Sequence, residues 1–199
     1  MANNANNANN ANNANLRKLM EGNKRYVSSN LNDTDISSER RFELKHGQYP
    51  FAIILGCSDS RVPVEILFDQ GLGDLYVVRV AGNVIGRMIV ASIEYAVLHL
   101  NVSLIMVMGH SQCGAVKATC DNEKLEGSLP SLTSALSPAL NSAKDMPGDL
   151  VENVAIANIG NVVKELGQSG ANFPGMIESG KLDIVPAYYN IDTGKVDLL

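Results

Sequence analysis

Tryptophan is absent from this chain of 199 residues, and cysteine occurs only three times. Three cysteines are too few, and odd in number, for a disulfide framework, which excludes small secreted proteins stabilised by disulfides and favours a reducing compartment. The N-terminus is rich in asparagine and has no apolar core segment of the kind found in an export signal. We therefore expect a cytoplasmic protein whose cysteines bind a metal or take part in catalysis.

Long hydrophobic runs and clusters of basic residues are also missing. The apolar runs, such as Val102 to Met108, are far shorter than the ~20 residues of a membrane-spanning helix, so no membrane partner is expected. The net charge is −5 and no basic stripe is visible, which argues against binding to nucleic acid. The chain does have 45% hydrophobic and 19% charged residues, a balance typical of one soluble globular domain.

The N-terminal segment differs in composition from the rest of the chain. Residues 2–15 repeat Ala-Asn-Asn, so we interpret residues 1–15 as a low-complexity arm, flexible or loosely helical, that cannot bury a core. Residues 16–199 are expected to form a single domain. Within it, residues 16–49 are polar and predicted to be helical, with a small apolar face at Leu16, Leu19 and Met20.

The remainder of the domain alternates short apolar runs with helical stretches, most clearly over residues 84–100 and 150–166. Continuous apolar runs separated by helices indicate a three-layer α/β fold, with a mostly parallel central sheet flanked by helices. The Asp and Gly within residues 191–196 favour a turn, and therefore a C-terminal antiparallel hairpin. The four predicted strands cover residues 51–55, 75–80, 102–108 and 182–187.

Metal-ligating side chains follow two of these predicted strands. Ligands of parallel α/β sheets bind beyond the carboxyl ends of the strands, where Cys57 follows the first run and His110 the third. Cys113 follows His110 by three residues, and we expect the two to meet one ion on the first turn of a helix. With Cys57 they offer the thiolate and imidazole groups that Zn²⁺ prefers. Cys120 lies about 10 Å further along that helix and is excluded. The fourth position is left to Asp59 or to water, and three protein ligands with one contested position are typical of a catalytic zinc site.

These residues belong to motifs that resemble those of the β-class carbonic anhydrases. The likeness covers nearly everything after the repeat. It implies a homodimer or dimer-based tetramer with zinc held by Cys57, His110 and Cys113. It also implies an Asp59–Arg61 dyad beside the metal, and a Gln48 that reaches the substrate from the partner subunit. The motifs are Cys57-Ser-Asp-Ser-Arg-Val-Pro63, Gly73-Asp-Leu-Tyr-Val-Val-Arg-Val-Ala-Gly-Asn83, Ser92-Ile-Glu-Tyr-Ala96 and Gly109-His-Ser-Gln-Cys-Gly-Ala115.

One part of the resemblance is incomplete. Some bacterial members of that family bind an inhibitory bicarbonate at a Trp, an Arg and a Tyr. Arg79 and Tyr189 occupy two of these places in this chain, whereas Ile54 stands where the Trp would be.

The resemblance implies reversible hydration of carbon dioxide to bicarbonate and a proton by a zinc-bound hydroxide. Two thiolates neutralise the charge of Zn²⁺, so its water should be less acidic than in a three-histidine site, where the pKa is about 7. Asp59 would accept a hydrogen bond from the hydroxide, and Arg61 would keep Asp59 ionised and oriented. Because Asp59 would displace water from zinc at lower pH, activity is predicted to rise from neutral toward alkaline pH.

Two other functions fit the same motifs. Proteins similar to this family hydrolyse carbon disulfide or carbonyl sulfide, and the motifs do not distinguish these substrates from carbon dioxide. The second alternative is a non-catalytic zinc protein, which would require Asp59 as a permanent fourth ligand in a closed site. The Asp59–Arg61 pair argues against the closed site, because Arg61 offers Asp59 another partner.

Overall fold

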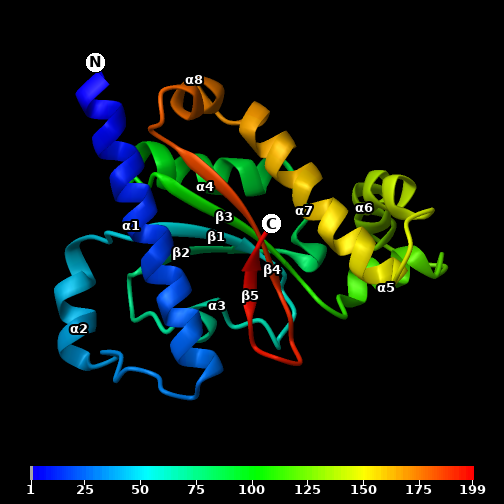
Figure 1. The fold of residues 1–199 in the computed structure, drawn as a ribbon, viewed down its shortest axis with the longest axis horizontal. Helices are drawn as coiled ribbons and strands as arrows, with labels where there is room; N and C mark the ends of the chain where they lie inside the picture. Colours follow the sequence, from blue (N-terminus) through cyan, green and yellow to red (C-terminus); the bar gives the residue numbers. More distant parts are fainter. Residues whose placement is uncertain (1) are drawn as a thin grey trace.

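The computed structural model describes residues 2–199 and has a five-stranded sheet at its centre (Figure 1). The strand order is β2-β1-β3-β4-β5; the first four strands are parallel, and β5 is antiparallel to β4. The predicted α/β fold, its parallel strands and its C-terminal hairpin are therefore confirmed. The strands are β1 Ala52–Gly56, β2 Leu75–Arg79, β3 Leu104–His110, β4 Asp183–Tyr189 and β5 Val196–Leu198.

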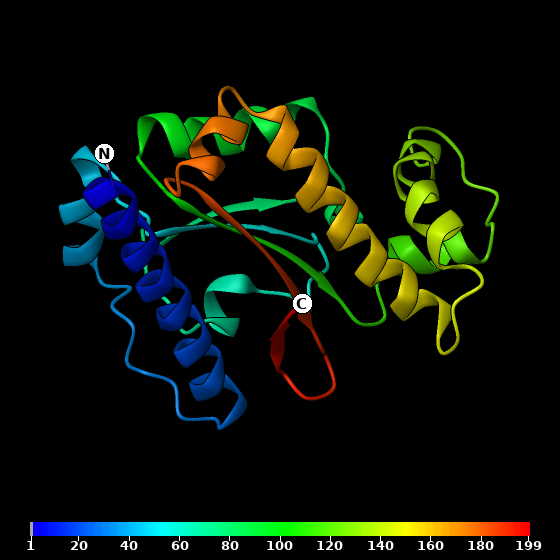
Figure 2. The ribbon, with the colours of Figure 1, turned by 45° about the horizontal axis from the view of Figure 1, so that its top comes forward.

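Helices cover both faces of the sheet, which gives the expected three layers (Figure 2). Residues of α4, α5, α6, α7 and α8 form one hydrophobic core with one face of the strands, and residues of α1 and α3 form a second core on the other face. None of the helices described is long and apolar enough to cross a bilayer. The helices are α1 Ala2–Val27, α2 Ser38–Glu43, α3 Val64–Leu67, α4 Arg87–His99, α5 Gly114–Cys120, α6 Pro130–Ala143, α7 Leu150–Ser169 and α8 Phe173–Glu178, with 3₁₀ turns at Leu44–His46 and Ala81–Asn83.

The N-terminal repeat forms the first half of α1, which runs through residue 15 without a break. Leu19 is fully buried against the sheet, as its apolar periodicity predicted. Polar contacts extend this packing, because Asn15 donates to the Phe51 carbonyl at 3.1 Å and Ser103 donates to Asn12 at 2.6 Å. The division of the chain at residue 15 stays a prediction.

The prediction of one helical segment over residues 16–49 was wrong beyond the end of α1. Residues 28–37 have no regular structure, and they connect α1 to the short α2. The Asp35 carboxylate accepts from the Ser37 amide at 2.9 Å, and the Ser37 hydroxyl caps α2 by accepting from the Arg40 amide at 3.1 Å. Such local side-chain bonds compete with helix formation, which explains the interruption.

The central strands bring the two predicted metal-binding segments together. β1 and β3 are neighbours, with Leu55 opposite Val107, so both chains leave the sheet at the same edge. α7 packs closely on β3 at this edge: a Cβ at Gly109 would lie 2.8 Å from the Ile159 side chain. The position of Gly109, directly before His110, therefore depends on the absence of a side chain.

Candidate metal centre

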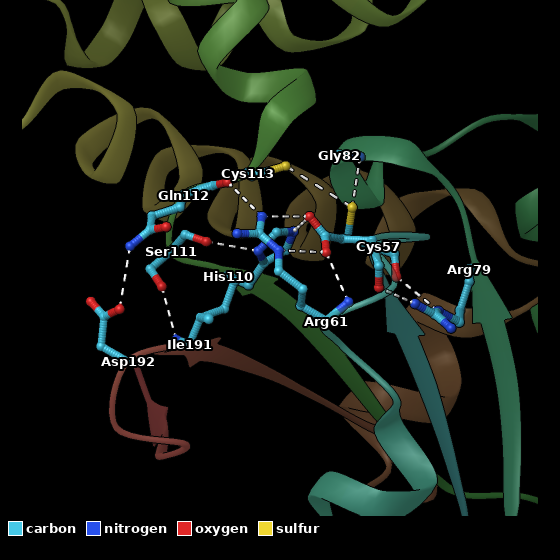
Figure 3. Close-up of polar contacts among 11 residues, drawn as sticks. Cys57, Arg61, Arg79, Gly82, His110, Ser111, Gln112, Cys113, Ile191 and Asp192 are labelled. Atoms are coloured by element: carbon cyan, nitrogen blue, oxygen red, sulfur yellow. Dashed lines mark hydrogen bonds and ion pairs between the residues drawn. The ribbon is translucent and has the colours of Figure 1, made fainter.

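Cys57, His110 and Cys113 meet at the carboxyl edge of the sheet (Figure 3). All three side chains are buried, and their ligand atoms lie within 4.8 Å of one another. The Cys57 and Cys113 sulfurs are 4.0 Å apart, which fits two Zn–S bonds of about 2.3 Å meeting at one ion. The structure thus unites the three predicted ligands in a Cys₂His metal site. Among the residues described, Cys120 belongs to no such group.

Two loops deliver these ligands, and we call Cys57–Arg61 the first ligand loop and His110–Cys113 the second. Cys57 directly follows β1, and Cys113 is the N-cap residue of α5. The expectation that His110 and Cys113 share a helical turn was wrong, because His110 is the last residue of β3. Gln112, in a left-handed conformation with φ of 55°, reverses the chain between them.

The His110 ring is oriented for metal binding. Its Nδ1 donates to the Ser111 carbonyl at 2.8 Å, and a carbonyl can only accept, so the proton of a neutral ring lies on Nδ1. Its Nε2 is buried and has no hydrogen-bond partner among the residues described. Nε2 therefore presents a free lone pair in a buried position, which fits a metal ion as its partner.

The charges of the two sulfurs also favour a cation at this place. The contact with Cys113 lowers the pKa of Cys57 to about 4, helped by His110 and by the Gly82 amide, which donates to the Cys57 sulfur at 3.3 Å. The same contact and burial raise the pKa of Cys113, because a second thiolate would be repelled. A bound cation would allow both cysteines to be thiolates.

Gly82 approaches Cys57 in a backbone conformation that suits glycine, with φ of 66°. A Cβ there would lie 3.3 Å from the Ala115 and Leu136 side chains. Any larger residue would therefore be strained in two ways, and it would disturb the hydrogen bond from the Gly82 amide to the Cys57 sulfur.

Asp59 and Arg61 form a two-point ion pair within the first ligand loop. Arg61 Nε donates to Asp59 Oδ1 at 2.9 Å, and Arg61 Nη2 donates to Oδ2 at 2.8 Å. This pair lowers the pKa of Asp59 to about 2 and raises that of Arg61. Asp59 Oδ2 lies 4.0 Å from His110 Nε2, so an ionised carboxylate borders the metal centre.

Arg79 holds the first ligand loop by its backbone. Its Nε donates to the Cys57 carbonyl at 2.8 Å and its Nη2 to the Asp59 carbonyl at 2.5 Å. Sequence reasoning missed this role, and the only signal at Arg79 was its match to a bicarbonate-binding arginine. The other two places of that regulatory site, Ile54 and Tyr189, are buried in the core on the α1 side of the sheet.

The β4–β5 hairpin holds the second ligand loop. The Ser111 amide donates to the Tyr189 carbonyl at 2.9 Å, and the Ser111 hydroxyl accepts from the Ile191 amide at 2.9 Å. Gln112 adds a weaker contact to Asp192 at 3.4 Å. Local sequence carries no signal of these bonds, because the hairpin lies about 80 residues further along the chain.

Gln48 lies apart from the metal centre within one chain. It is exposed and precedes β1, whereas Cys57 follows the opposite end of that strand. Five residues of strand span about 17 Å. The expectation that Gln48 acts on the substrate of a partner subunit therefore stays a prediction.

Comparison with known proteins gives consistent matches along the chain. A family model described as carbonic anhydrase matches residues 52–196. A carbonic anhydrase of Mycolicibacterium smegmatis is 37% identical over 92% of this chain and 90% of that protein. Carbonic anhydrase 2 of Mycobacterium tuberculosis is 38% identical with the same coverage of both chains.

Solved structures show the same fold. The structure of the β-carbonic anhydrase CcaA is 30% identical with a TM-score of 0.72, over 92% of this chain and 94% of that one. A structure from a study of two tetrameric β-carbonic anhydrases of Sordaria macrospora is 26% identical with a TM-score of 0.73, over 81% of this chain and 87% of that one.

Proposed function

Because the chain belongs to the β-class carbonic anhydrase family, we propose that it catalyses the reversible hydration of carbon dioxide to bicarbonate and a proton. The cofactor in this proposal is Zn²⁺, held by Cys57, His110 and Cys113. The observation that carries the proposal is the buried Cys₂His cluster, with an unpartnered His110 Nε2 beside an ionised carboxylate.

The side chains around the cluster have separate tasks. Bound zinc would supply a Lewis acid that makes an attacking water more acidic. Asp59 accepts a hydrogen bond from that water and directs an oxygen lone pair at the carbon of carbon dioxide. Arg61 occupies both carboxylate oxygens of Asp59 and keeps them fixed. Since the pKa of Asp59 is about 2, it stays ionised at neutral pH and orients the water without storing the proton.

The position of Asp59 supports a catalytic site over a closed, non-catalytic one. Both of its oxygens face Arg61, and it lies outside the group of ligand atoms within 4.8 Å. A permanent fourth ligand would have to give up this ion pair. The fourth metal position is therefore proposed to belong to water, as in catalytic zinc sites.

We further propose that the enzyme is cytoplasmic and acts as a homodimer or a dimer-based tetramer. The tetrameric state described for the Sordaria macrospora enzymes supports such an assembly. Gln48, at the amino end of β1, would then contact carbon dioxide in the site of the partner subunit. Sedimentation velocity of the wild type and of Gln48→Ala measures their assembly, and stopped-flow hydration of carbon dioxide measures their activity. A variant that assembles like the wild type but is less active would support the catalytic role of Gln48.

Stopped-flow hydration of carbon dioxide between pH 6.5 and 9 tests the proposed function. We expect activity that rises with pH, and a loss of about 100-fold in Asp59→Asn, which keeps the shape of the carboxylate but removes its charge. Because the Asp59 carboxylate stays ionised over this whole range, any rise that comes from its release of the metal at higher pH should be weaker in Asp59→Asn than in the wild type.

A wild-type profile that is flat with pH would contradict the charge argument for the metal site. Parallel assays with carbon disulfide and carbonyl sulfide identify the substrate. Zinc-loaded protein that hydrolyses these gases and leaves carbon dioxide unchanged would overturn the proposal.

A further inference from the structure

A cavity of about 600 Å³ adjoins the metal centre. Arg61 and Gln112 of the two ligand loops line it, as do Asp149 and Glu152 at the start of α7 and Asp192 of the hairpin loop. The mechanism proposed above uses only Arg61 among these residues. The cavity is therefore a candidate site for a second ligand.

Tyr188 is the residue of this cavity that points to a ligand. It is 7% exposed, and its buried hydroxyl makes no hydrogen bond of good geometry among the residues described, although the Glu152 carboxylate lies near it. A buried hydroxyl without a hydrogen bond is unfavourable, and a ligand with an acceptor atom would supply the missing partner. Burial raises the pKa of Tyr188, and Glu152 and Asp149 add to the rise, so this phenol is a hydrogen-bond donor at every assay pH.

The charges around the cavity favour a cation over an anion. Its two cationic residues, Arg61 and Lys117, already form ion pairs with aspartates outside the lining. Its three carboxylates, on Asp149, Glu152 and Asp192, have no such cationic partner among the residues described. An anion such as bicarbonate would meet this negative field.

The size of the cavity favours an organic cation over a metal ion. In the part of the chain that the structure describes, the only three metal-ligating side chains close enough to share an ion are those of the metal centre. The carboxylates of the cavity are thus too dispersed to hold a small ion. A volume of about 600 Å³ accommodates a small ring with several polar atoms.

We propose that this cavity binds the buffer base that removes the proton of the reaction, a small nitrogen base of the imidazole type. One nitrogen of the neutral base donates a hydrogen bond to Glu152, and its other nitrogen accepts one from Tyr188. On transfer this second nitrogen gives up the bond from Tyr188 and takes the proton of the reaction, and BH⁺ then donates to the Tyr188 oxygen. The inference rests on the proposed function, because each hydration releases one proton: CO₂ + H₂O + B → HCO₃⁻ + BH⁺. The neighbouring carboxylates stabilise BH⁺ relative to B, and so favour the transfer.

A binding experiment on the zinc-loaded protein tests the site without an activity assay. 2-Methylimidazole is titrated in, and backbone amide shifts of Gln112, Glu152 and Asp192 are followed by NMR. The methyl group hinders metal ligation, and the visible spectrum of cobalt-substituted protein checks that the probe stays off the metal. We expect saturable shifts, and binding weakened about threefold or more in both Glu152→Gln and Tyr188→Phe.

Glu165→Gln is the matched control. Glu165 is an exposed carboxylate on the same helix, and it does not line this cavity. Its variant should bind the probe as the wild type does. Equal affinity in the wild type, Glu152→Gln and Tyr188→Phe would overturn the proposal.

Buffer kinetics separate a base from an anion. At saturating carbon dioxide, the half-saturating concentration of 2-methylimidazole should rise about threefold in Glu152→Gln, with kcat/KM for carbon dioxide unchanged. Phosphate, tested as the anionic alternative, should show no effect of Glu152→Gln. Saturation by phosphate that weakens in Lys117→Gln would mark an anion site and overturn the proposal.

Absence of the base site and absence of carbon dioxide hydration would give different results. If the probe binds in a Glu152-dependent way but the protein does not hydrate carbon dioxide, the base site is supported and the proposed function is contradicted. If the protein hydrates carbon dioxide but binds the probe without any dependence on Glu152, the proposed function is supported and the base site is contradicted.

Discussion

The two ligand loops of the metal centre are built from different interactions. The first, Cys57–Arg61, is held by arginine side chains: Arg79 binds two of its carbonyls and Arg61 pairs with Asp59. The second, His110–Cys113, is held by neutral hydrogen bonds between Ser111 and the β4–β5 hairpin. Arg61 also links the loops, because its Nη2 donates to the Gln112 carbonyl at 3.1 Å.

This difference separates function from stability. Arg61 and Arg79 are exposed, so their removal exposes little apolar surface, although it frees the loop that carries Asp59. Ser111, in contrast, bonds to the hairpin that completes the sheet. A change in the first loop should therefore affect the metal centre more than the fold, and a change in the second should affect both.

The largest effect is expected from Cys113→Ala, which removes one of the three ligands of the metal centre. Mutation of a residue that only hydrogen-bonds to a metal ligand typically weakens metal binding about 10–100-fold, and loss of a direct ligand should weaken zinc binding by more than this. Zinc content after dialysis measures the loss of binding, and stopped-flow hydration of carbon dioxide measures the loss of activity. Cys120→Ala removes a thiol outside the cluster and should retain both zinc and activity; equal losses in the two variants would contradict the assignment of Cys113.

An intermediate effect is expected from Arg79→Met, which removes both bonds to the first ligand loop. We expect zinc affinity and kcat to fall about tenfold, with a melting temperature close to that of the wild type. Competitive chelation and thermal unfolding test this. Arg87→Met, at an exposed arginine that starts α4, is the control. A large fall in melting temperature with unchanged zinc affinity would reverse the distinction between the loops.

The smallest effect is expected from Ser111→Ala, which leaves the Ile191 amide without its acceptor. The free energy of unfolding should fall by about 1 kcal/mol, and zinc affinity by a few-fold at most. Urea unfolding of the zinc-loaded protein measures the first quantity. Ser134→Ala, at an exposed serine of α6, should change stability by less than about 0.5 kcal/mol. Equal stability of both variants would show that the Ser111 hydroxyl does not hold the second loop, and would leave only the bond from the Ser111 amide to the Tyr189 carbonyl.

Most of the architecture was predictable because it depends on local patterns. Continuous apolar runs predicted the strands, and the Asp and Gly of residues 191–196 predicted the turn of the hairpin. The end of α1 was not predictable in this way. A polar segment after Val27 is compatible with helix or loop, and side-chain bonds at Ser37 decided between them.

The sequence by itself determined the chemistry of the metal centre. Thiolates and imidazoles are donors that zinc prefers, and Cys57 and His110 could each be recognised from their places after Gly56 and Gly109 at the ends of strands. It also placed Arg61 two residues from Asp59, a spacing at which their ion pair forms.

Only the tertiary structure decided how that centre is held. It placed His110 on β3, left its Nε2 unpartnered, and brought the Arg79 side chain to carbonyls 22 and 20 residues away in the chain. It also enclosed the Tyr188 hydroxyl beside a cavity. The physical reason is that these contacts depend on strand order and on the packing of α7 and the hairpin. Local sequence specifies side-chain chemistry and periodicity, but it contains no record of which distant backbone groups will meet.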